Sequence, residues 1–184
     1  MTWRSIRSIS ALALLGAAAL QAQPRYVRSE VRIPTPAVTL IDSRGERVPL
    51  ASVLDAPGPV VLQFVFTTCP AVCPMLSSAL SGAQTEMGEG TRLVSISIDP
   101  EYDTPARLRE YAKRFKAGPR WRFLTGGRDD VAAVQKAFGA WRVNKMSHQP
   151  LTFLRAAPGD PWVRLAGPLS AADLIAEYLR LAGR

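Results

Sequence analysis

Two nearly continuous apolar runs lie in the middle of the chain. Val60–Phe66 and Leu93–Ile98 are rich in β-branched, leucine and aromatic residues, the pattern of strands buried on both faces. Val38–Ile41 and Glu46–Val48 flank the turn residues 42–45 and predict an N-terminal β-hairpin. Three shorter apolar runs predict further strands, at Trp121–Leu124, Leu151–Leu154 and Trp162–Leu165.

Helical spacing of apolar residues alternates with these strands. It predicts helices over Val72–Met87 and Asp129–Phe138. Thr104 followed by Pro105 predicts the start of another helix, and Ser170 predicts the start of the last one. Strands alternating with helices indicate one α/β domain with a mainly parallel central sheet. The last two strands form a hairpin, so the sheet is expected to be mixed.

The sequence pattern of the N-terminal region predicts an export signal followed by a tether. Residues 1–22 combine Arg4 and Arg7 with an apolar stretch and a cleavage region of small residues. This is the pattern of a signal peptide, which is either cleaved or retained as an N-terminal anchor. A buried first helix is the alternative, but no polar face repeats at helical spacing. Residues 23–36 are polar and proline-rich and predict a flexible tether, which leaves 37–184 as the folded domain.

Composition limits the classes of function. The chain has 184 residues with 47% apolar and 21% charged residues, ordinary values for a globular domain. Two cysteines and one histidine exclude four-cysteine zinc or iron–sulfur sites and histidine-rich sites. The net charge of +8 is spread along the chain without aromatic residues interleaved in a basic stripe, so no nucleic-acid partner is expected.

Cys69 and Cys73 follow the first buried strand directly, just before a predicted helix. The i, i+4 spacing places both sulfurs on one face of a helical turn, where they could share a metal or form a disulfide. The amides of a helix N-terminus favour thiolates, so lowered thiol pKa values are expected. A purely structural disulfide is the alternative, although so short a loop gains little chain entropy.

His148 is the only histidine and precedes the Leu151–Leu154 strand in a loop that can approach the cysteines. A lone histidine is more often a surface or packing residue, but two thiolates and one imidazole would suit Cu(I). Met146, two residues earlier, is a candidate soft ligand, whereas Met87 is expected in the core. Asp103 follows the second buried strand and could orient a neighbour or contact a partner; turn formation explains it equally well.

Taken together, these motifs resemble the Sco/SenC family of copper chaperones. The resemblance rests on Cys-Pro-x2-Cys-Pro at 69–74, on Asp-Pro-x2-Asp-Thr-Pro at 99–105, and on the late His148. It implies a thioredoxin-like fold, with the central mixed sheet flanked by helices and extended by the N-terminal hairpin. It also implies copper held by Cys69, Cys73 and His148, as Cu(I), with Cu(II) left open.

The resemblance further implies a role and a location. Family members are periplasmic, often membrane-tethered, and mature the dinuclear copper site of cytochrome c oxidase by delivering copper, reducing the target cysteines, or both. The expected partner is therefore the copper-site subunit of that oxidase or another exported copper protein. This sequence has Ala71 and Ser147 where the family usually has acids, which weakens the case for Cu(II) more than for Cu(I).

Enzymatic functions remain as alternatives. A thiol–disulfide oxidoreductase could use Cys69 to attack and Cys73 to resolve, although redox enzymes of this fold usually have two residues between the cysteines. His148 distinguishes copper binding from thiol–disulfide exchange, because a pure thiol enzyme does not need a histidine there. A peroxidase of the related peroxiredoxin group would need a threonine three residues before the attacking cysteine. This chain has Phe66 there, so a peroxidase is the least favoured function.

Overall fold

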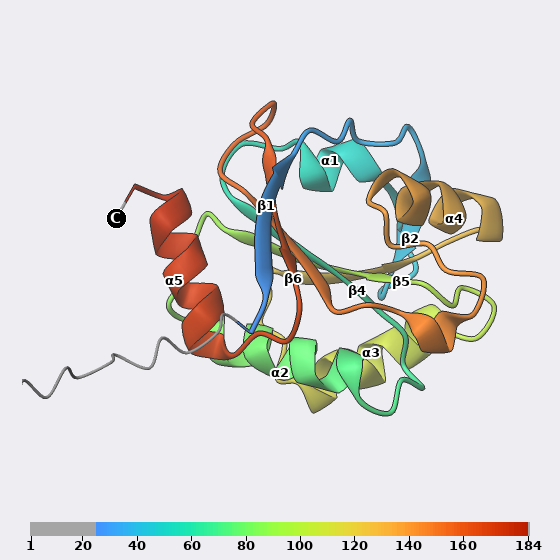
Figure 1. The fold of residues 1–184 in the computed structure, drawn as a ribbon. Coiled ribbons are helices and arrows are strands. Elements are labelled where there is room, and N and C mark those ends of the chain that lie inside the picture. Colours follow the sequence, from blue (N-terminus) through green and yellow to red (C-terminus); the bar gives the residue numbers. More distant parts are fainter. Residues whose placement is uncertain (1–24, 184) are drawn as a thin grey trace, which may run out of the picture.

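The computed structural model describes residues 25–183, which form a single eight-stranded sheet covered by helices on both faces (Figure 1). The strand order is β1-β8-β7-β4-β5-β6-β2-β3. The bounds are β1 Val27–Val31, β2 Thr39–Asp42, β3 Arg47–Pro49, β4 Val60–Val65, β5 Arg92–Ser97, β6 Trp121–Thr125, β7 Leu151–Arg155 and β8 Trp162–Ala166. The predicted hairpins are present as β2–β3 and β7–β8, and β2 joins the first hairpin to the sheet through β6.

The expectation of a mainly parallel sheet is wrong, although the sheet is mixed as predicted. Only the β4–β5 and β5–β6 pairings are parallel, and the other five are antiparallel. β4 is buried along its whole length, Gln63 included, because helices cover both faces of the sheet, while one of its two neighbours, β7, runs antiparallel to it. Burial on both faces therefore does not require parallel neighbours.

The helices divide into two layers (Figure 1). α1 (Leu50–Leu54) and α4 (Arg128–Ala137) pack on one face, and α2 (Val72–Ala83), α3 (Pro105–Arg114) and α5 (Ala171–Leu181) pack on the other. A short 3-10 helix, η1 (Lys145–Ser147), precedes β7. α2 ends at Ala83, earlier than predicted, although Met87 is buried in the core as expected.

Two helix starts predicted from sequence are confirmed. The Thr104 hydroxyl accepts a hydrogen bond from the Arg107 amide at 3.3 Å, with Pro105 in the first turn. Ser170 and Asp173 form a reciprocal capping box at the start of α5. The first of these caps fixes the end of the Asp99–Thr104 loop, which lies beside the cysteines.

Part of the segment expected to be a flexible tether is instead ordered. Val27–Val31 forms β1, an edge strand antiparallel to β8. Tyr26 and Arg28 also bind the buried Glu177 carboxylate of α5, at 2.8 and 3.1 Å. The backbone of Arg25 and Tyr26 passes so close to Gly167 (φ +138°) that a side chain there would collide with it.

The predicted signal peptide or anchor, residues 1–22, lies outside the described residues. Between residues 25 and 183, no helix has the length and apolar character needed to cross a membrane.

Candidate metal centre

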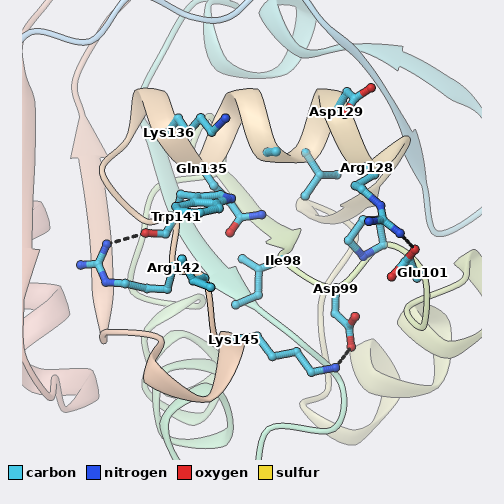
Figure 2. Close-up of a pocket in the computed structure, with 14 residues that line it drawn as sticks. Ile98, Asp99, Glu101, Arg128, Asp129, Gln135, Lys136, Trp141, Arg142 and Lys145 are labelled. Atoms are coloured by element: carbon cyan, nitrogen blue, oxygen red, sulfur yellow. Dashed lines mark hydrogen bonds and ion pairs between the residues drawn. The ribbon is translucent and has the colours of Figure 1, made fainter.

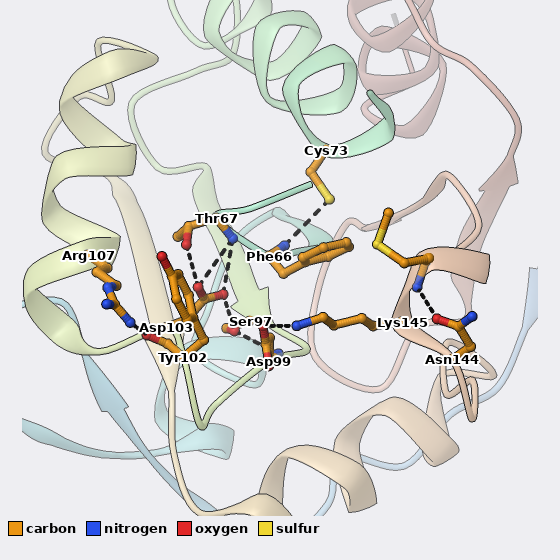
Figure 3. A network of polar contacts seen from close by, with 11 residues as sticks. Phe66, Thr67, Cys73, Ser97, Asp99, Tyr102, Asp103, Arg107, Asn144 and Lys145 are labelled. Carbon is orange, nitrogen blue, oxygen red and sulfur yellow. Dashed lines mark hydrogen bonds and ion pairs between the residues drawn. The ribbon is translucent and has the colours of Figure 1, made fainter. Parts of the chain in front are cut away.

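The two cysteines lie where β4 gives way to α2. Cys69 is in the connecting loop and partly exposed, whereas Cys73 is in the first turn of α2 and fully buried. The Cys73 amide donates to the Cys69 sulfur at 3.3 Å. The Phe66 amide donates to the Cys73 sulfur at 3.4 Å (Figure 3). Both thiols are free, and the hydrogen bond between them agrees with the proximity predicted from their spacing.

The expected lowering of the thiol pKa is wrong for Cys73. Burial raises the pKa of the Cys73 thiol, and the neighbouring Cys69 sulfur adds to the rise, while the hydrogen bond from Phe66 opposes it. The apolar surroundings therefore outweigh the helix N-terminus at this position. Cys73 keeps its proton at neutral pH until a positive ion displaces it.

His148 is buried between η1 and β7, with 7% of its surface exposed. Burial lowers the pKa of the imidazole to about 4, so the ring is neutral at pH 7. Its edge meets the ring of Phe66, with centroids 6.3 Å apart. Within residues 25–183, neither ring nitrogen makes a hydrogen bond of normal geometry, although the Phe64 backbone lies near enough to the ring to oppose part of the fall in its pKa.

An unpartnered pair of buried nitrogens is unfavourable. Leaving one buried polar group without a partner costs on the order of 1–3 kcal/mol, and His148 leaves two. A neutral imidazole is also the form that binds metals. The environment of His148 therefore suits a ligand waiting for an ion, which a packing residue would not need.

Cys69 and His148 line the same small cavity, of about 80 Å³. Its walls are completed by residues from the cysteine loop and from the η1 segment: Phe66, Pro70, Ala71, Val72, Lys145 and Met146. Cys73 lies behind this wall, since its sulfur faces the Phe66 amide (Figure 3). In the described part of the chain, no three His, Cys, Asp or Glu side chains are close enough together to hold a metal ion.

The structure thus brings the predicted residues together in pairs. Cys69 is joined to Cys73 by a hydrogen bond and to His148 by a shared cavity. A site using all three requires the Cys73 sulfur, which does not line the cavity, to come within reach of the other two donors. Two soft sulfurs and a neutral imidazole fit Cu(I) by the chemistry of the donor set.

Asp103 holds the cysteine loop in place from below. Its carboxylate is fully buried and accepts hydrogen bonds from the Thr67 hydroxyl (2.5 Å), the Thr67 amide (3.2 Å) and the Ser97 hydroxyl (2.6 Å) (Figure 3). Burial raises the pKa of Asp103, and these hydrogen bonds oppose the rise. Of the roles considered from sequence, two are present: Asp103 orients the neighbouring Thr67, and its amide closes the predicted turn by donating to the Asp99 carbonyl at 2.8 Å. Its burial excludes direct contact of the carboxylate with a partner.

Lys145 connects the η1 segment to the loop after β5. It pairs with Asp99 at 2.5 Å and lies 5.6 Å from the centre of the Phe66 ring. The sequence alone does not indicate a role for Lys145, Thr67 or Phe66 at the site. Their contacts depend on segments up to 80 residues apart, so only the position of Asp99 and Asp103 after a buried strand hinted at them.

A larger cavity of about 420 Å³ opens between α4 and these same loops (Figure 2). Its charges are largely matched, with Arg128 paired to Glu101 and Lys145 paired to Asp99. It contains no cysteine or histidine. Of these two cavities, the smaller one is lined by a cysteine and a histidine and the larger one by neither.

The SCO1/SenC family profile matches residues 34–181, which include both cysteines, Asp103 and His148. The chain belongs to the SCO1/SenC family. Protein SenC of Rhodobacter capsulatus is 31% identical to this SCO1/SenC chain over 126 residues, covering 67% of this chain and 50% of that protein.

Solved Sco structures confirm the thioredoxin-like class. The copper-bound ScoI of Arabidopsis thaliana superposes with a TM-score of 0.71 at 25% identity, covering 83% of this chain and 99% of that one. BsSco, a member of the Sco family of cytochrome c oxidase assembly proteins, superposes with a TM-score of 0.69 at 22% identity, covering 85% of this chain and 98% of that one. The SCO1/SenC chain spans only 24% to 64% of the length of its curated relatives.

Proposed function

We propose that this SCO1/SenC protein binds Cu(I) as cargo through Cys69, Cys73 and His148. The observation that carries the proposal is His148, a neutral buried imidazole without a partner, lining the same cavity as a cysteine. Sulfur and imidazole donors suit Cu(I). Copper is bound to a relative of the same fold, the Arabidopsis ScoI.

The donor set favours Cu(I) over Cu(II). Ala71 and Ser147 are exposed at the rim and supply no carboxylate to the site, so it lacks the hard oxygen ligands that would help a divalent ion. The Cys73 thiol, whose pKa is raised, releases a proton when the ion binds. Cu(I) affinity consequently rises with pH above neutrality.

The destination of the copper is the dinuclear site of cytochrome c oxidase, in an exported setting. BsSco belongs to a family of assembly proteins for that oxidase, and residues 1–22 have the pattern of an export signal or anchor. The protein delivers copper to that site, reduces its cysteines, or does both. In this arrangement the folded domain, which includes β1, carries the function, and the residues that precede it hold it at the membrane.

A second function, thiol–disulfide exchange, is favoured by the contact between the two cysteines. Cys69 is partly exposed and accepts a hydrogen bond from the Cys73 amide. The Cys69 thiolate would attack a partner disulfide and expel one partner thiolate. Cys73 would then attack the mixed disulfide, which releases the reduced partner and leaves a Cys69–Cys73 disulfide for an external dithiol to reduce.

An anaerobic titration of the reduced full-length protein with Cu(I), against a competing chelator, tests the proposal. We expect tight one-to-one binding that is lost in Cys69→Ser. It should weaken at least about 100-fold in His148→Ala, beyond the usual effect of weakening a supporting contact. The matched control is Gln149→Ala, which removes the exposed neighbour of His148 and should leave the affinity unchanged.

The other results separate the two functions. Unchanged affinity in His148→Ala would remove His148 from the site. Failure of the unaltered protein to compete with the chelator would overturn the copper proposal. The dithiol would then remain as the working group, and exchange with a disulfide substrate would be the activity to measure.

A further inference from the structure

The methionine next to the cavity is placed unlike the other described methionines. Met146 lines the cavity with Cys69 and His148, and 59% of its surface is exposed. Met87 is 2% exposed and packs in the core, and Met75 lies on α2 outside the cavity wall. Burying a methionine side chain is favourable by roughly 1.5–3 kcal/mol, so packing does not explain why Met146 lies at the surface.

The backbone holds Met146 in this position. The Asn144 side chain accepts a hydrogen bond from the Met146 amide at 2.9 Å and caps η1 (Figure 3). The Ser147 and His148 amides donate to the Asn144 and Lys145 carbonyls, at 2.9 and 3.1 Å. This single turn directs His148 inward and leaves Met146 toward solvent, so the two side chains lie at different depths of one cavity.

The donors around the cavity therefore differ in accessibility. Cys73 is fully buried behind the wall, His148 is 7% exposed, Cys69 is partly exposed and Met146 is mostly exposed. An ion arriving from outside meets the thioether and the Cys69 sulfur before it can reach the other two. A thioether is a soft, neutral donor that binds Cu(I) and discriminates against harder divalent ions.

We propose that Met146 is a Cu(I) ligand at the mouth of the cavity, which captures the ion with Cys69 and passes it to His148 and Cys73. This inference rests on the proposed function of the site. The exchange moves no electrons: a bond from Cu(I) to the Met146 sulfur forms as the ion leaves its donor, and it breaks as a bond to His148 or Cys73 replaces it. Without carboxylates at Ala71 and Ser147, the thioether gives the mouth its preference for Cu(I).

The test uses the reduced full-length protein with its methionine methyl groups labelled with carbon-13. The Met146 signal is assigned by its absence in Met146→Leu, a substitution that keeps size and apolar character but removes the sulfur. We expect the addition of Cu(I) to shift the Met146 methyl resonance, with the Met75 resonance unchanged. Zn(II) should not shift it, because the thioether is a poor ligand for zinc.

Rates of copper transfer from a chelator provide the second readout. Met146→Leu should take up Cu(I) about tenfold more slowly, a loss at the low end of those caused by changes around metal sites. Met75→Leu is the matched control and should keep the rate of the unaltered protein. Both variants should keep the circular dichroism spectrum of the parent, because neither side chain contributes to the core.

The outcomes distinguish this inference from the function on which it rests. Tight Cu(I) binding with an unmoved Met146 resonance and an unchanged rate would overturn the role of Met146 and leave the copper proposal standing. An equal shift with Zn(II) would also overturn it, since the shift would then report a loop movement. Absence of Cu(I) binding by the unaltered protein would overturn both.

Discussion

Two buried polar side chains on either side of the cysteine loop have opposite environments. Asp103 is fully buried, and its carboxylate accepts three hydrogen bonds from Thr67 and Ser97. His148 is 7% exposed, and within residues 25–183 both of its ring nitrogens lack a partner. Because buried polar groups are nearly always satisfied, the first pattern is that of a structural group, and the second supports the proposal that His148 is a metal ligand.

The largest test of this contrast is the effect of copper on stability. A ligand present at about 1,000 times its dissociation constant stabilises the folded state by about 4 kcal/mol. We expect this gain for Cu(I) with the reduced protein and its loss in His148→Leu. Asp103→Asn leaves the three proposed metal ligands, Cys69, Cys73 and His148, unchanged. It should therefore keep the stabilisation by Cu(I). Chemical unfolding with and without Cu(I) under anaerobic conditions measures it.

The reverse result would contradict the roles assigned to Asp103 and His148. If Asp103→Asn lost the stabilisation by copper and His148→Leu kept it, the carboxylate would belong to the metal site and the imidazole to the framework.

The next effect concerns the metal-free protein. Asp103→Ala should lower the free energy of unfolding by about 3 kcal/mol, because the Thr67 amide and the hydroxyls of Thr67 and Ser97 lose their acceptor in a buried region. Asp160→Ala removes an exposed carboxylate in a turn and should stay within about 0.5 kcal/mol of the parent. Urea unfolding of both variants gives the comparison. Equal stability of the two variants would show that the satisfied carboxylate is not structural.

A smaller effect follows from the pH dependence of His148. Its pKa is about 4 in the folded chain against an ordinary 6.5, so between these values the unfolded chain binds a proton that the folded chain does not. Stability of the metal-free protein therefore falls as the pH falls, by about 2 kcal/mol between pH 6.5 and about pH 5. Urea unfolding at several pH values should reveal this loss.

His148→Leu should be nearly free of this pH dependence and at least as stable as the parent at pH 7, since it buries no unpartnered nitrogen. A parent and a variant with the same slope would assign the acid sensitivity to other groups. Asp103 would not be one of those groups, because its raised pKa makes the protein more stable, not less, as the pH falls.

Much of the fold could be predicted from local pattern. The buried strands β4 and β5 and the caps at Thr104 and Ser170 are encoded within a few residues, and the prediction of each is confirmed. β1 was missed because its five residues are mostly exposed. It becomes a strand only through pairing with β8, more than 130 residues later. The short α1 (Leu50–Leu54) was missed as well.

The sequence indicated which candidate residues lie near one another better than it indicated their burial and protonation. The spacing of Cys69 and Cys73 predicted their contact. The position of His148 before a strand made it a candidate ligand, and the resemblance to the Sco/SenC family strengthened that expectation. The sequence could not show that burial raises the pKa of the Cys73 thiol, because that burial comes from distant elements packing around it. Nor could it show that Phe66 contacts His148 through its ring and Cys73 through its amide.

The attachment of β1 has a mechanical consequence. The strand is held by β8, by the close passage at Gly167 and by the buried carboxylate of Glu177, whereas the cavity lies at β4 and the segment before β7. A pull on the N-terminal end of the domain would thus be carried by the edge of the sheet and by α5, with β8 and β7 between it and β4. The loops that line the smaller cavity then lie outside the direct path of that load.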